Sequence, residues 1–226
     1  MDRQIITTAD GSDSIAIPAM QVTYHSVHGA LQESNHVFIK EGLQYYLSQY
    51  PDTTALRIFE MGFGTGLNAL LTYAESLHSN RPVMYESIEA FPLDQSLYQN
   101  LNYCTQMQRS ELTTTFASMQ EAPWEHPTEI NPQFQLYKRR GSLLNYQPKE
   151  RFHLVYFDAF APTAQPELWT TEIFRMLHNM LYPGGMLTTY CSKSSVRRAM
   201  VEAGFTVHKI PGPPRKREMV RATRSS

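Results

Sequence analysis

The most constraining feature of this chain is a glycine-rich turn that directly follows an apolar run. Glu60 closes the run that begins at Arg57, and Gly62, Gly64 and Gly66 then occupy every second position. Glycine allows the backbone to turn sharply and to approach a ligand where a Cβ atom would collide. The segment therefore predicts a strand, a tight turn and a helix start beside a nucleotide-like ligand.

The spacing of these glycines separates two classes of cofactor. A dinucleotide-binding turn has the pattern G-x-G-x-x-G, with its third glycine where the helix packs on the strand. Leu67 occupies that position here, and the glycine falls one residue earlier. The order E-x-G-x-G-x-G is typical of S-adenosylmethionine (AdoMet) pockets, and it places Asn68 in the first turn of the following helix. The alternative is an ordinary strand-to-helix turn.

Length and cysteine content set broad limits on the protein. The 226 residues suit one large domain, and 42% of them are hydrophobic, as expected of a globular chain. There are only two cysteines, Cys104 and Cys191, and we find no secretory segment or long apolar span. We therefore expect a cytoplasmic protein with no membrane partner. The eight histidines show no metal-ligand spacing, so no metal is expected.

Basic residues are concentrated at the C-terminal end. Residues 193–226 have nine basic and two acidic side chains, a net charge of +7, whereas the other 192 residues have 11 basic and 19 acidic ones, a net charge of −8. Contacts to phosphate supply much of the affinity for nucleic acids. The uneven charge therefore favours a polyanion as partner, and the alternative is a solvated tail.

Apolar strands alternate with helical patterns along the chain. Strands are predicted at residues 24–26, 36–39, 56–60, 82–89, 134–138, 152–157, 186–190 and 205–210, and helices at residues 42–50, 67–77, 94–107, 167–181 and 195–203. This alternation predicts an α/β fold with a mostly parallel sheet and helices on both faces. Together with the glycine turn, it indicates the Rossmann-like fold of class I AdoMet-dependent methyltransferases. Residues 1–55 are expected to form a short β extension packed on the core, with a frayed first dozen residues. Residues 56–226 would form the methyltransferase part of the same single domain.

The candidate site residues lie where the predicted strands end. In an open α/β sheet, ligands bind beyond the carboxyl ends of the strands. Glu89 follows Gly66 by 23 residues, a spacing at which a carboxylate accepts hydrogen bonds from ribose hydroxyls. Ser142 follows a third strand, at a position where many AdoMet-dependent enzymes recognise adenine. Asp158 and Phe160 follow the fourth, in a loose variant of the Asp/Asn-Pro-Pro-aromatic motif of amine methyltransferases.

A carboxylate at Asp158 suits methyl transfer to an amine. The main task in this reaction is to align a lone pair with the methyl carbon. An alkylamine with a pKa near ~10 arrives protonated and must first lose a proton. Asp158 is predicted to accept that proton or to orient the N–H bonds, and Phe160 to face the cationic centre or stack on a base. The alternatives are a capping role for Asp158 and a core position for Phe160.

Several motifs, in order, resemble the methyltransferase-domain family of MnmC. They are residues 60–68, residues 89–93, residues 158–162 with Pro166 and Trp169, residues 183–185, 196–198, 203–205 and 215–219, and residues 36–39 upstream. The resemblance extends over nearly the whole chain from Tyr24. The family often has Gly-Asp where this chain has Gly141-Ser142.

This resemblance implies an AdoMet-dependent tRNA methyltransferase. It would convert 5-aminomethyl-(2-thio)uridine at the wobble position to the 5-methylaminomethyl form, with the wobble base held outside its stack. No flavin-binding turn is found, so no FAD is expected, and a separate enzyme would have to supply the aminomethyl group. The expected cofactor-binding residues are Glu60, Gly62, Gly64, Gly66, Asn68, Glu89, Ser142 and Asp158. The expected contacts to the anticodon stem-loop are Arg197, Arg198, Arg215, Lys216 and Arg217.

Two other interpretations remain at this point. A small-molecule amine methyltransferase or an aminopropyltransferase would have the same fold, and fold alone does not exclude either. A non-catalytic RNA-binding module is the third interpretation. The basic segment favours tRNA over a small acceptor, and the combination of Glu60, Glu89 and Asp158 favours an enzyme over a module.

Overall fold

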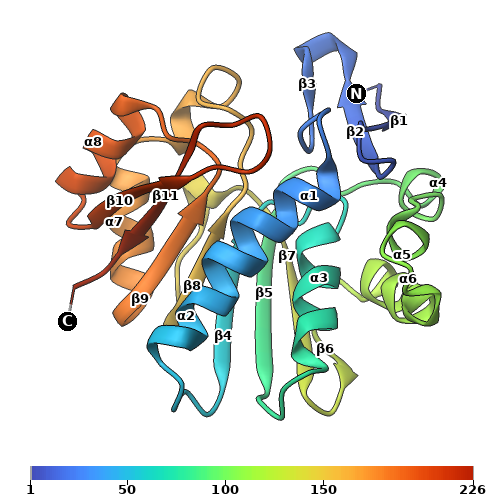
Figure 1. Cartoon of the computed structure of the whole chain (residues 1–226), viewed down its shortest axis with the longest axis horizontal. Helices are drawn as coiled ribbons and strands as arrows, with labels where there is room; N and C mark the ends of the chain where they lie inside the picture. Colours follow the sequence, from blue (N-terminus) through green and yellow to red (C-terminus); the bar gives the residue numbers. More distant parts are fainter. Residues whose placement is uncertain (1, 226) are drawn as a thin grey trace.

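A central eight-stranded sheet forms the core of the computed structural model, which describes residues 2–225 (Figure 1). The strand order is β10-β11-β9-β8-β4-β5-β7-β6. The bounds are β4 (Leu56–Met61), β5 (Val83–Glu89), β6 (Pro127–Asn131), β7 (Phe134–Arg140), β8 (Phe152–Phe157), β9 (Leu181–Thr189), β10 (Thr206–Pro211) and β11 (Glu218–Thr223). The five strands from β9 to β7 are parallel, whereas β6 and β11 pair antiparallel with their neighbours. The predicted mostly parallel sheet is confirmed.

The central strands are buried on both faces, which explains their continuous apolar sequences. In β8, Tyr156 contributes to one hydrophobic cluster and its neighbour Phe157 to the other. In β4, Ile58 likewise contributes to the first cluster and its neighbour Phe59 to the second. Successive side chains of a strand point to opposite faces, so two helical layers are needed to cover this sheet.

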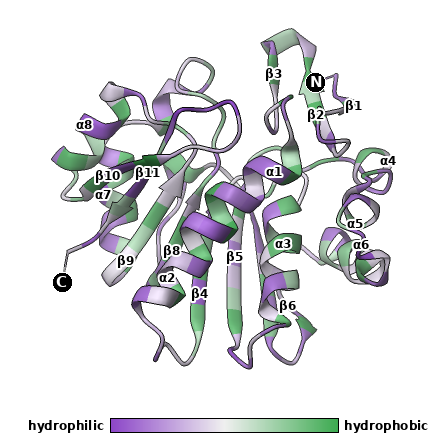
Figure 2. Ribbon diagram, in the orientation of Figure 1, coloured by the Kyte–Doolittle hydropathy of each residue, from purple (hydrophilic) through white to green (hydrophobic). Residues whose placement is uncertain are grey.

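Helices provide both of these layers. On one face the continuous helix from α1 to α2 packs beside α3, and on the other lie α7 and α8 (Figure 1). Figure 2 shows hydrophilic and hydrophobic residues alternating around the helix from α1 to α2, as expected of a helix with one buried side. The bounds are α1 (Ala30–Ser34), α2 (Tyr45–Gln49), α3 (Leu67–Ser76), α4 (Gln95–Tyr98), α5 (Tyr103–Gln106), α6 (Thr113–Glu121), α7 (Thr171–Met180) and α8 (Ser194–Glu202).

The prediction of a strand at residues 36–39 is wrong. These residues lie in a π-helical segment, Asn35–Gln44, that joins α1 to α2 in one continuous helix. Val37, Phe38 and Ile39 are buried against the sheet, so tertiary packing overrides their β propensity. A Cβ atom at Gly42 would lie 3.2 Å from Thr188 Oγ1, which shows how closely the helix approaches β9.

The N-terminal residues form a small antiparallel sheet rather than a frayed end. Its strands are β1 (Gln4–Thr7), β2 (Asp13–Ile17) and β3 (Val22–Thr23), and residues 24–26 follow β3 as a bend and loop instead of the predicted strand. Asn102 anchors this sheet to the core, because its backbone N–H donates to Asp13 Oδ2 (3.0 Å) and its Oδ1 accepts from Asp13 N (2.9 Å). The same residue lies between α4 and α5, where a single helix was predicted over residues 94–107.

Three further boundaries differ from the prediction. β6 and β11 were not predicted. β6 is a polar strand at the edge of the sheet, whereas β11 lies between β10 and β9 with Met219, Val220 and Ala222 buried. The helix predicted from residue 167 begins at Thr171, where the Thr170 hydroxyl accepts from the Ile173 N–H. Residues 183–185 lie within β9 at a shift of register instead of preceding it. Within residues 2–225 we find no helix with the length and apolar character needed to span a membrane.

Candidate cofactor and acceptor site

A cavity of about 260 Å³ lies at the carboxyl ends of β4, β5 and β8. The chain runs from β4 through β5 to β7 on one side of the sheet and then returns to β8 and β9 on the other. The cavity thus lies at the switch point, where open α/β sheets bind their ligands. Six of the predicted site residues line it: Gly62, Gly64, Asn68, Glu89, Asp158 and Phe160.

The glycine turn has the left-handed backbone conformation that favours glycine. All three glycines have positive φ angles: +92° at Gly62, +51° at Gly64 and +76° at Gly66. A Cβ atom at Gly62 would lie 3.1 Å from the carbonyl oxygen of Asp158, and one at Gly66 would lie 2.5 Å from Nε2 of Gln120. Gly66 therefore serves the packing at the start of α3 and does not line the cavity.

Glu89 connects the end of β5 to the glycine turn. Its Oε2 accepts a hydrogen bond from Gly64 N (3.0 Å), and its Oε1 accepts one from Phe91 N (2.8 Å). These bonds fix the orientation of the carboxylate at the cavity. Each oxygen retains a second lone pair with which to accept a ligand hydroxyl.

Glu60 lies beneath the cavity and not on its wall. Its side chain is fully buried, and Oε2 accepts from the hydroxyl of Ser87 (2.7 Å), the residue opposite it on β5. Its Oε1 has no hydrogen-bond partner within residues 2–225. Burial raises the pKa of Glu60 to about 8, with the Ser87 hydrogen bond opposing the shift. Direct contact of Glu60 with a cofactor remains a prediction.

Asp158 and Asn68 lie against each other on the cavity wall. Asn68 Nδ2 donates to Asp158 Oδ2 (2.9 Å), and no residue within 2–225 donates to the buried Asn68 Oδ1. Burial raises the pKa of Asp158 to about 7, and the charge of Glu33 adds to that shift, whereas the Asn68 hydrogen bond and the charge of Lys216 oppose it. A carboxyl group that titrates near neutral pH suits the transfer of a proton.

The segment from Asp158 to Phe160 is held in place from both sides. The carbonyl oxygen of Ala159 accepts from the Tyr190 hydroxyl (2.9 Å), and that of Phe160 accepts from Trp169 Nε1 (2.9 Å). The Phe160 ring lines the cavity and meets the edge of Tyr24 at 5.2 Å between centroids. Phe160 is therefore a wall residue with a fixed backbone, and its catalytic role stays a prediction.

Ser142 does not line the cavity. Its hydroxyl accepts from Leu144 N (3.2 Å) and caps the short 3₁₀ turn that follows β7. The nearest link to the site is the backbone of Gly141, whose N–H donates to the Glu89 carbonyl (2.9 Å). The structure gives the predicted contact of Ser142 with adenine no support.

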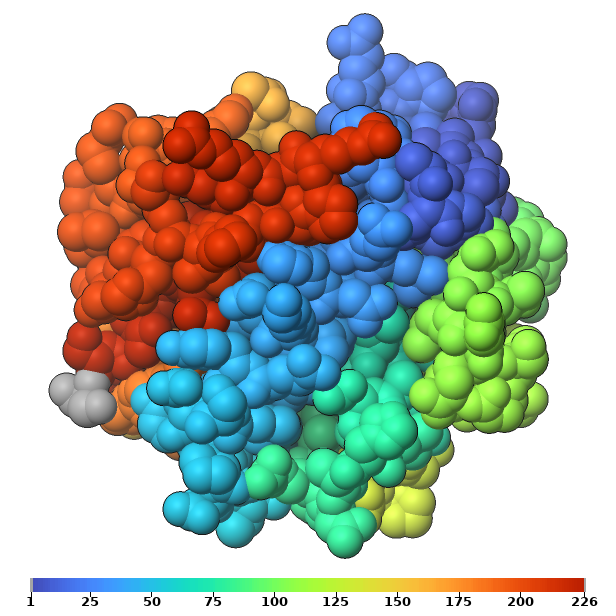
Figure 3. Space-filling model, in the orientation of Figure 1, coloured from blue at the N-terminus to red at the C-terminus, as the bar shows by residue number. Residues whose placement is uncertain are grey.

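The predicted RNA contacts fall in two separate places, and part of the C-terminal charge is paired internally. Arg197 and Arg198 are on α8, whereas residues 215–217 are in the β10–β11 loop, which reaches across the molecule towards the N-terminal segment (Figure 3). Arg221 pairs with Glu41 (3.2 Å), a carboxylate outside residues 193–226, whereas the pair of Lys209 with Glu218 (2.8 Å) is already balanced within the +7. The charge available to a polyanion is therefore smaller than +7.

The N-terminal segment supplies cavity residues that the sequence did not reveal. Tyr24 and His25 line the cavity together with Met20 and Arg3. His25 Nε2 lies 2.9 Å from Thr65 Oγ1, and burial lowers the pKa of His25 to about 4, so the ring is neutral where it supports the glycine turn. No motif marks these residues, because their positions depend on how β1–β3 dock.

The residues present fit AdoMet. The cavity combines glycine backbone at close range, a carboxylate at the end of β5 and an acceptor, Asn68 Oδ1, that has no hydrogen-bond partner among residues 2–225. Its carboxylates suit a cationic sulfonium. In the described part of the chain, no group of three His, Cys, Asp or Glu side chains is arranged to hold a metal ion. The class of protein that this fold and cavity define is an AdoMet-dependent methyltransferase.

Comparisons with known proteins agree with this class. Residues 133–225 match the family described as S-adenosyl-L-methionine-dependent methyltransferase. The chain is similar to "tRNA 5-methylaminomethyl-2-thiouridine biosynthesis bifunctional protein MnmC" from Ectopseudomonas mendocina (strain ymp), with 33% identity over 214 residues that cover 87% of this chain and 31% of that protein. The MnmC of Pseudomonas putida (strain F1) is 29% identical over 213 residues, with the same coverage.

A solved structure extends the similarity over the whole fold. The crystal structure of MNMC2 from Aquifex aeolicus matches with a TM-score of 0.80 and 23% identity, and the match covers 100% of this chain and 71% of that one. This structural match confirms the fold, and together with the family and sequence matches it confirms the resemblance predicted from the sequence. The chain spans about a third of the length of the curated relatives that it matches.

Proposed function

We propose that this protein methylates the aminomethyl nitrogen of 5-aminomethyl-(2-thio)uridine at the wobble position of tRNA. The observation that favours an amine acceptor is Asp158, a partly buried carboxylate on the cavity wall with a pKa of about 7. The relatives whose names specify 5-methylaminomethyl-2-thiouridine biosynthesis in tRNA favour this particular amine. A separate enzyme would supply the aminomethyl group.

The proposed reaction needs a free amine lone pair. AdoMet held by the glycine turn and Glu89 would supply an electrophilic methyl group, and the N–CH₃ bond would form as the S–CH₃ bond broke with its electron pair kept on sulfur. Asp158 takes one proton from the substrate's ammonium and leaves the neutral amine. Asn68 holds the Asp158 carboxylate in one orientation by its 2.9 Å hydrogen bond. The hydrogen bonds that the carbonyls of Ala159 and Phe160 accept hold this segment in position beside the cavity.

Labelled AdoMet and tRNA from cells that lack the final methylation test this function. After incubation with the protein, the tRNA is digested to nucleosides, and label is expected in 5-methylaminomethyluridines. Label in no such nucleoside would reject the proposal. Label transferred to a small alkylamine in a parallel incubation, with none in the tRNA, would favour the small-molecule alternative.

Glu89 is expected to bind the ribose hydroxyls of AdoMet. Glu89→Gln exchanges one acceptor oxygen for an NH₂ group that faces a backbone N–H donor, so the dissociation constant for AdoMet should rise by about tenfold or more. Titration calorimetry measures this constant. Glu129→Gln, an exposed substitution on β6, is the matched control. Equal affinities in Glu89→Gln and the control would exclude Glu89 from the cofactor site.

Lys216 and Arg217 are expected to contact the phosphates of the anticodon stem-loop. Each phosphate contact contributes about 0.7 to 0.9 to the slope of log affinity against log salt. Lys216→Ala with Arg217→Ala should therefore raise the KM for tRNA and reduce that slope by about 1.5. Lys149→Ala with Arg151→Ala removes the same charge from the exposed segment before β8 and should change neither quantity. Unchanged values in both pairs would contradict the contact.

A further inference from the structure

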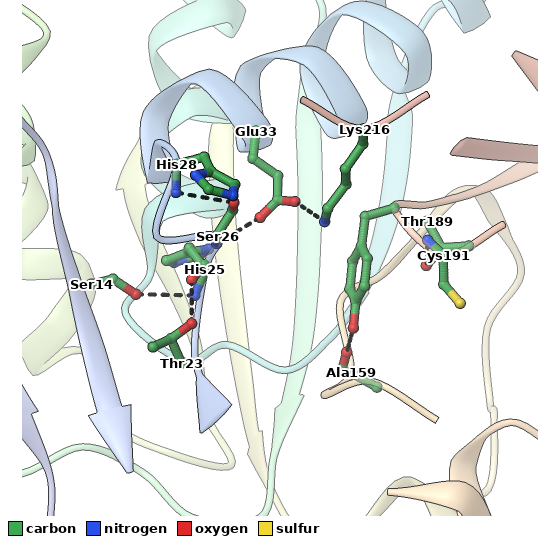
Figure 4. A network of polar contacts seen from close by, with 11 residues as sticks. Ser14, Thr23, His25, Ser26, His28, Glu33, Ala159, Thr189, Cys191 and Lys216 are labelled. Carbon is green, nitrogen blue, oxygen red and sulfur yellow. Dashed lines mark hydrogen bonds and ion pairs between the residues drawn. The ribbon is translucent and has the colours of Figure 1, made fainter. Parts of the chain in front are cut away.

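Glu33 is a buried carboxylate beside the proposed reaction centre that the mechanism above does not use. It lies on α1 with a side chain that is only 10% exposed, and its Oε2 accepts from Ser26 N (2.8 Å). Its Oε1 forms an ion pair with Lys216 Nζ from the β10–β11 loop (Figure 4). Burying a carboxylate is costly unless a cation compensates it, so this position requires a positive charge.

The same cation lies over an aromatic ring. Lys216 Nζ is 4.3 Å from the centroid of the Tyr190 ring, and the hydroxyl of that tyrosine donates to the carbonyl of Ala159. A carboxylate together with an aromatic face is a typical environment for a bound ammonium group. The charges of Glu33 and Lys216 also act on the Asp158 carboxyl, because Glu33 raises its pKa and Lys216 lowers it. Glu33, Tyr190 and Lys216 thus adjoin the segment at which the amine is to be methylated.

The Lys216 ammonium, which lies between Glu33 and the Tyr190 ring, is the same kind of group as the proposed substrate's amine. A lysine side chain ends in a primary alkylammonium, as does the aminomethyl substituent of the proposed acceptor. Lys216 is one-third exposed and lies in a loop between the exposed Arg215 and Arg217, which are expected to meet phosphate. A lysine in such a loop has an alternative anionic partner once a polyanion binds.

We propose that Glu33 and the face of Tyr190 form the binding site for the substrate's primary ammonium, and that Lys216 occupies this site until the substrate displaces it. This inference rests on the proposed function. Displaced Lys216 turns to the tRNA backbone, so phosphate contact and admission of the amine occur together. Glu33 holds the ammonium, Asp158 removes its proton, and the Glu33 carboxylate then faces the cationic methylated product. An uncharged acceptor gains nothing from this site.

The test compares binding of one tRNA with and without the aminomethyl group. The ratio of the two affinities isolates the ammonium contact from phosphate contacts. Glu33→Gln retains an acceptor for Ser26 N but loses the charge, so the ratio should fall by about tenfold or more. Lys216→Ala should weaken both affinities and leave the ratio equal to or above that of the wild type. Lys209→Met, from the exposed pair with Glu218 on the same hairpin, is the control and should keep the ratio unchanged.

A second measurement does not depend on tRNA. Propylammonium should raise the melting temperature of Lys216→Ala more than that of the wild type, because the variant leaves the site empty, and the added Glu33→Gln substitution should abolish this gain. An unchanged affinity ratio in Glu33→Gln would overturn the inference while the proposed function stands. If the wild type fails to methylate aminomethyl-tRNA, the proposed function fails, and the propylammonium result alone decides the inference: no selective stabilisation would overturn it.

Discussion

Replacement of Asp158 by asparagine is expected to lower kcat by about a thousandfold, within the range that general acid–base catalysis contributes. Asparagine has nearly the same shape, and its side-chain oxygen accepts the hydrogen bond from Asn68 Nδ2. It takes no proton, so the ammonium form of the acceptor persists. Affinity for AdoMet should change by less than about tenfold, since the glycine turn and Glu89 are untouched. Single-turnover methylation of aminomethyl-tRNA and titration calorimetry measure the two effects separately.

The pH dependence of kcat/KM identifies the group that removes the proton from the substrate's amine. A base with a pKa of about 7 is protonated and inactive below that pH, so kcat/KM of the wild type should rise with pH and level off above about 7. The residual activity of Asp158→Asn should lack this step. Asp52→Asn, exposed before β4, removes a carboxylate elsewhere and should retain the wild-type profile. An Asp158→Asn protein that binds AdoMet poorly but turns over at the normal rate would assign Asp158 to cofactor binding instead.

The sequence predicted the parts of the site that depend on local backbone geometry. The glycine turn, the ends of β5 and β8 and the first turn of α3 are each encoded by adjacent residues. The site residues predicted in these segments line the cavity, except for Gly66 in the turn, and Glu60 just before the turn does not line it either. Glu60 was correctly found at the end of β4, but alternation along the strand directs it beneath the turn. The spacing of residues in the sequence predicts where a residue lies along a strand. It does not by itself predict which face of the sheet the side chain is on.

The parts that sequence analysis missed depend on contacts between distant segments. Residues 36–39 have the composition of a strand, yet they are helical because burial against the sheet outweighs their propensity. Glu33 and Lys216 are 183 positions apart and meet only because the β10–β11 loop crosses to α1. The C-terminal charge likewise gave no sign that Arg221 and Arg224 are used within the fold, where Arg224 donates to the carbonyl of Leu181 (2.7 Å). Charge counts predict a partner's chemistry, but not which cations remain free to meet it.

Glu60 should make the stability of the protein fall as pH rises, which is the second large effect expected. Its pKa is about 8 in the folded state and 4.5 without burial, so the folded state binds the proton more tightly. The free energy of unfolding therefore decreases between pH 4.5 and about 8, by on the order of 5 kcal/mol at 1.36 kcal/mol per pKa unit. Glu60→Gln keeps an acceptor for Ser87 and carries no charge at any pH. Its stability relative to the wild type should thus improve by that amount from pH 4.5 to pH 9, as urea unfolding measures.

Asp158 contributes a slope of the same sign in both proteins, so only the difference between them reports Glu60. The exposed substitution Glu129→Gln should give a curve parallel to the wild type, and a parallel curve for Glu60→Gln would show that Glu60 is ionised in the folded protein at neutral pH.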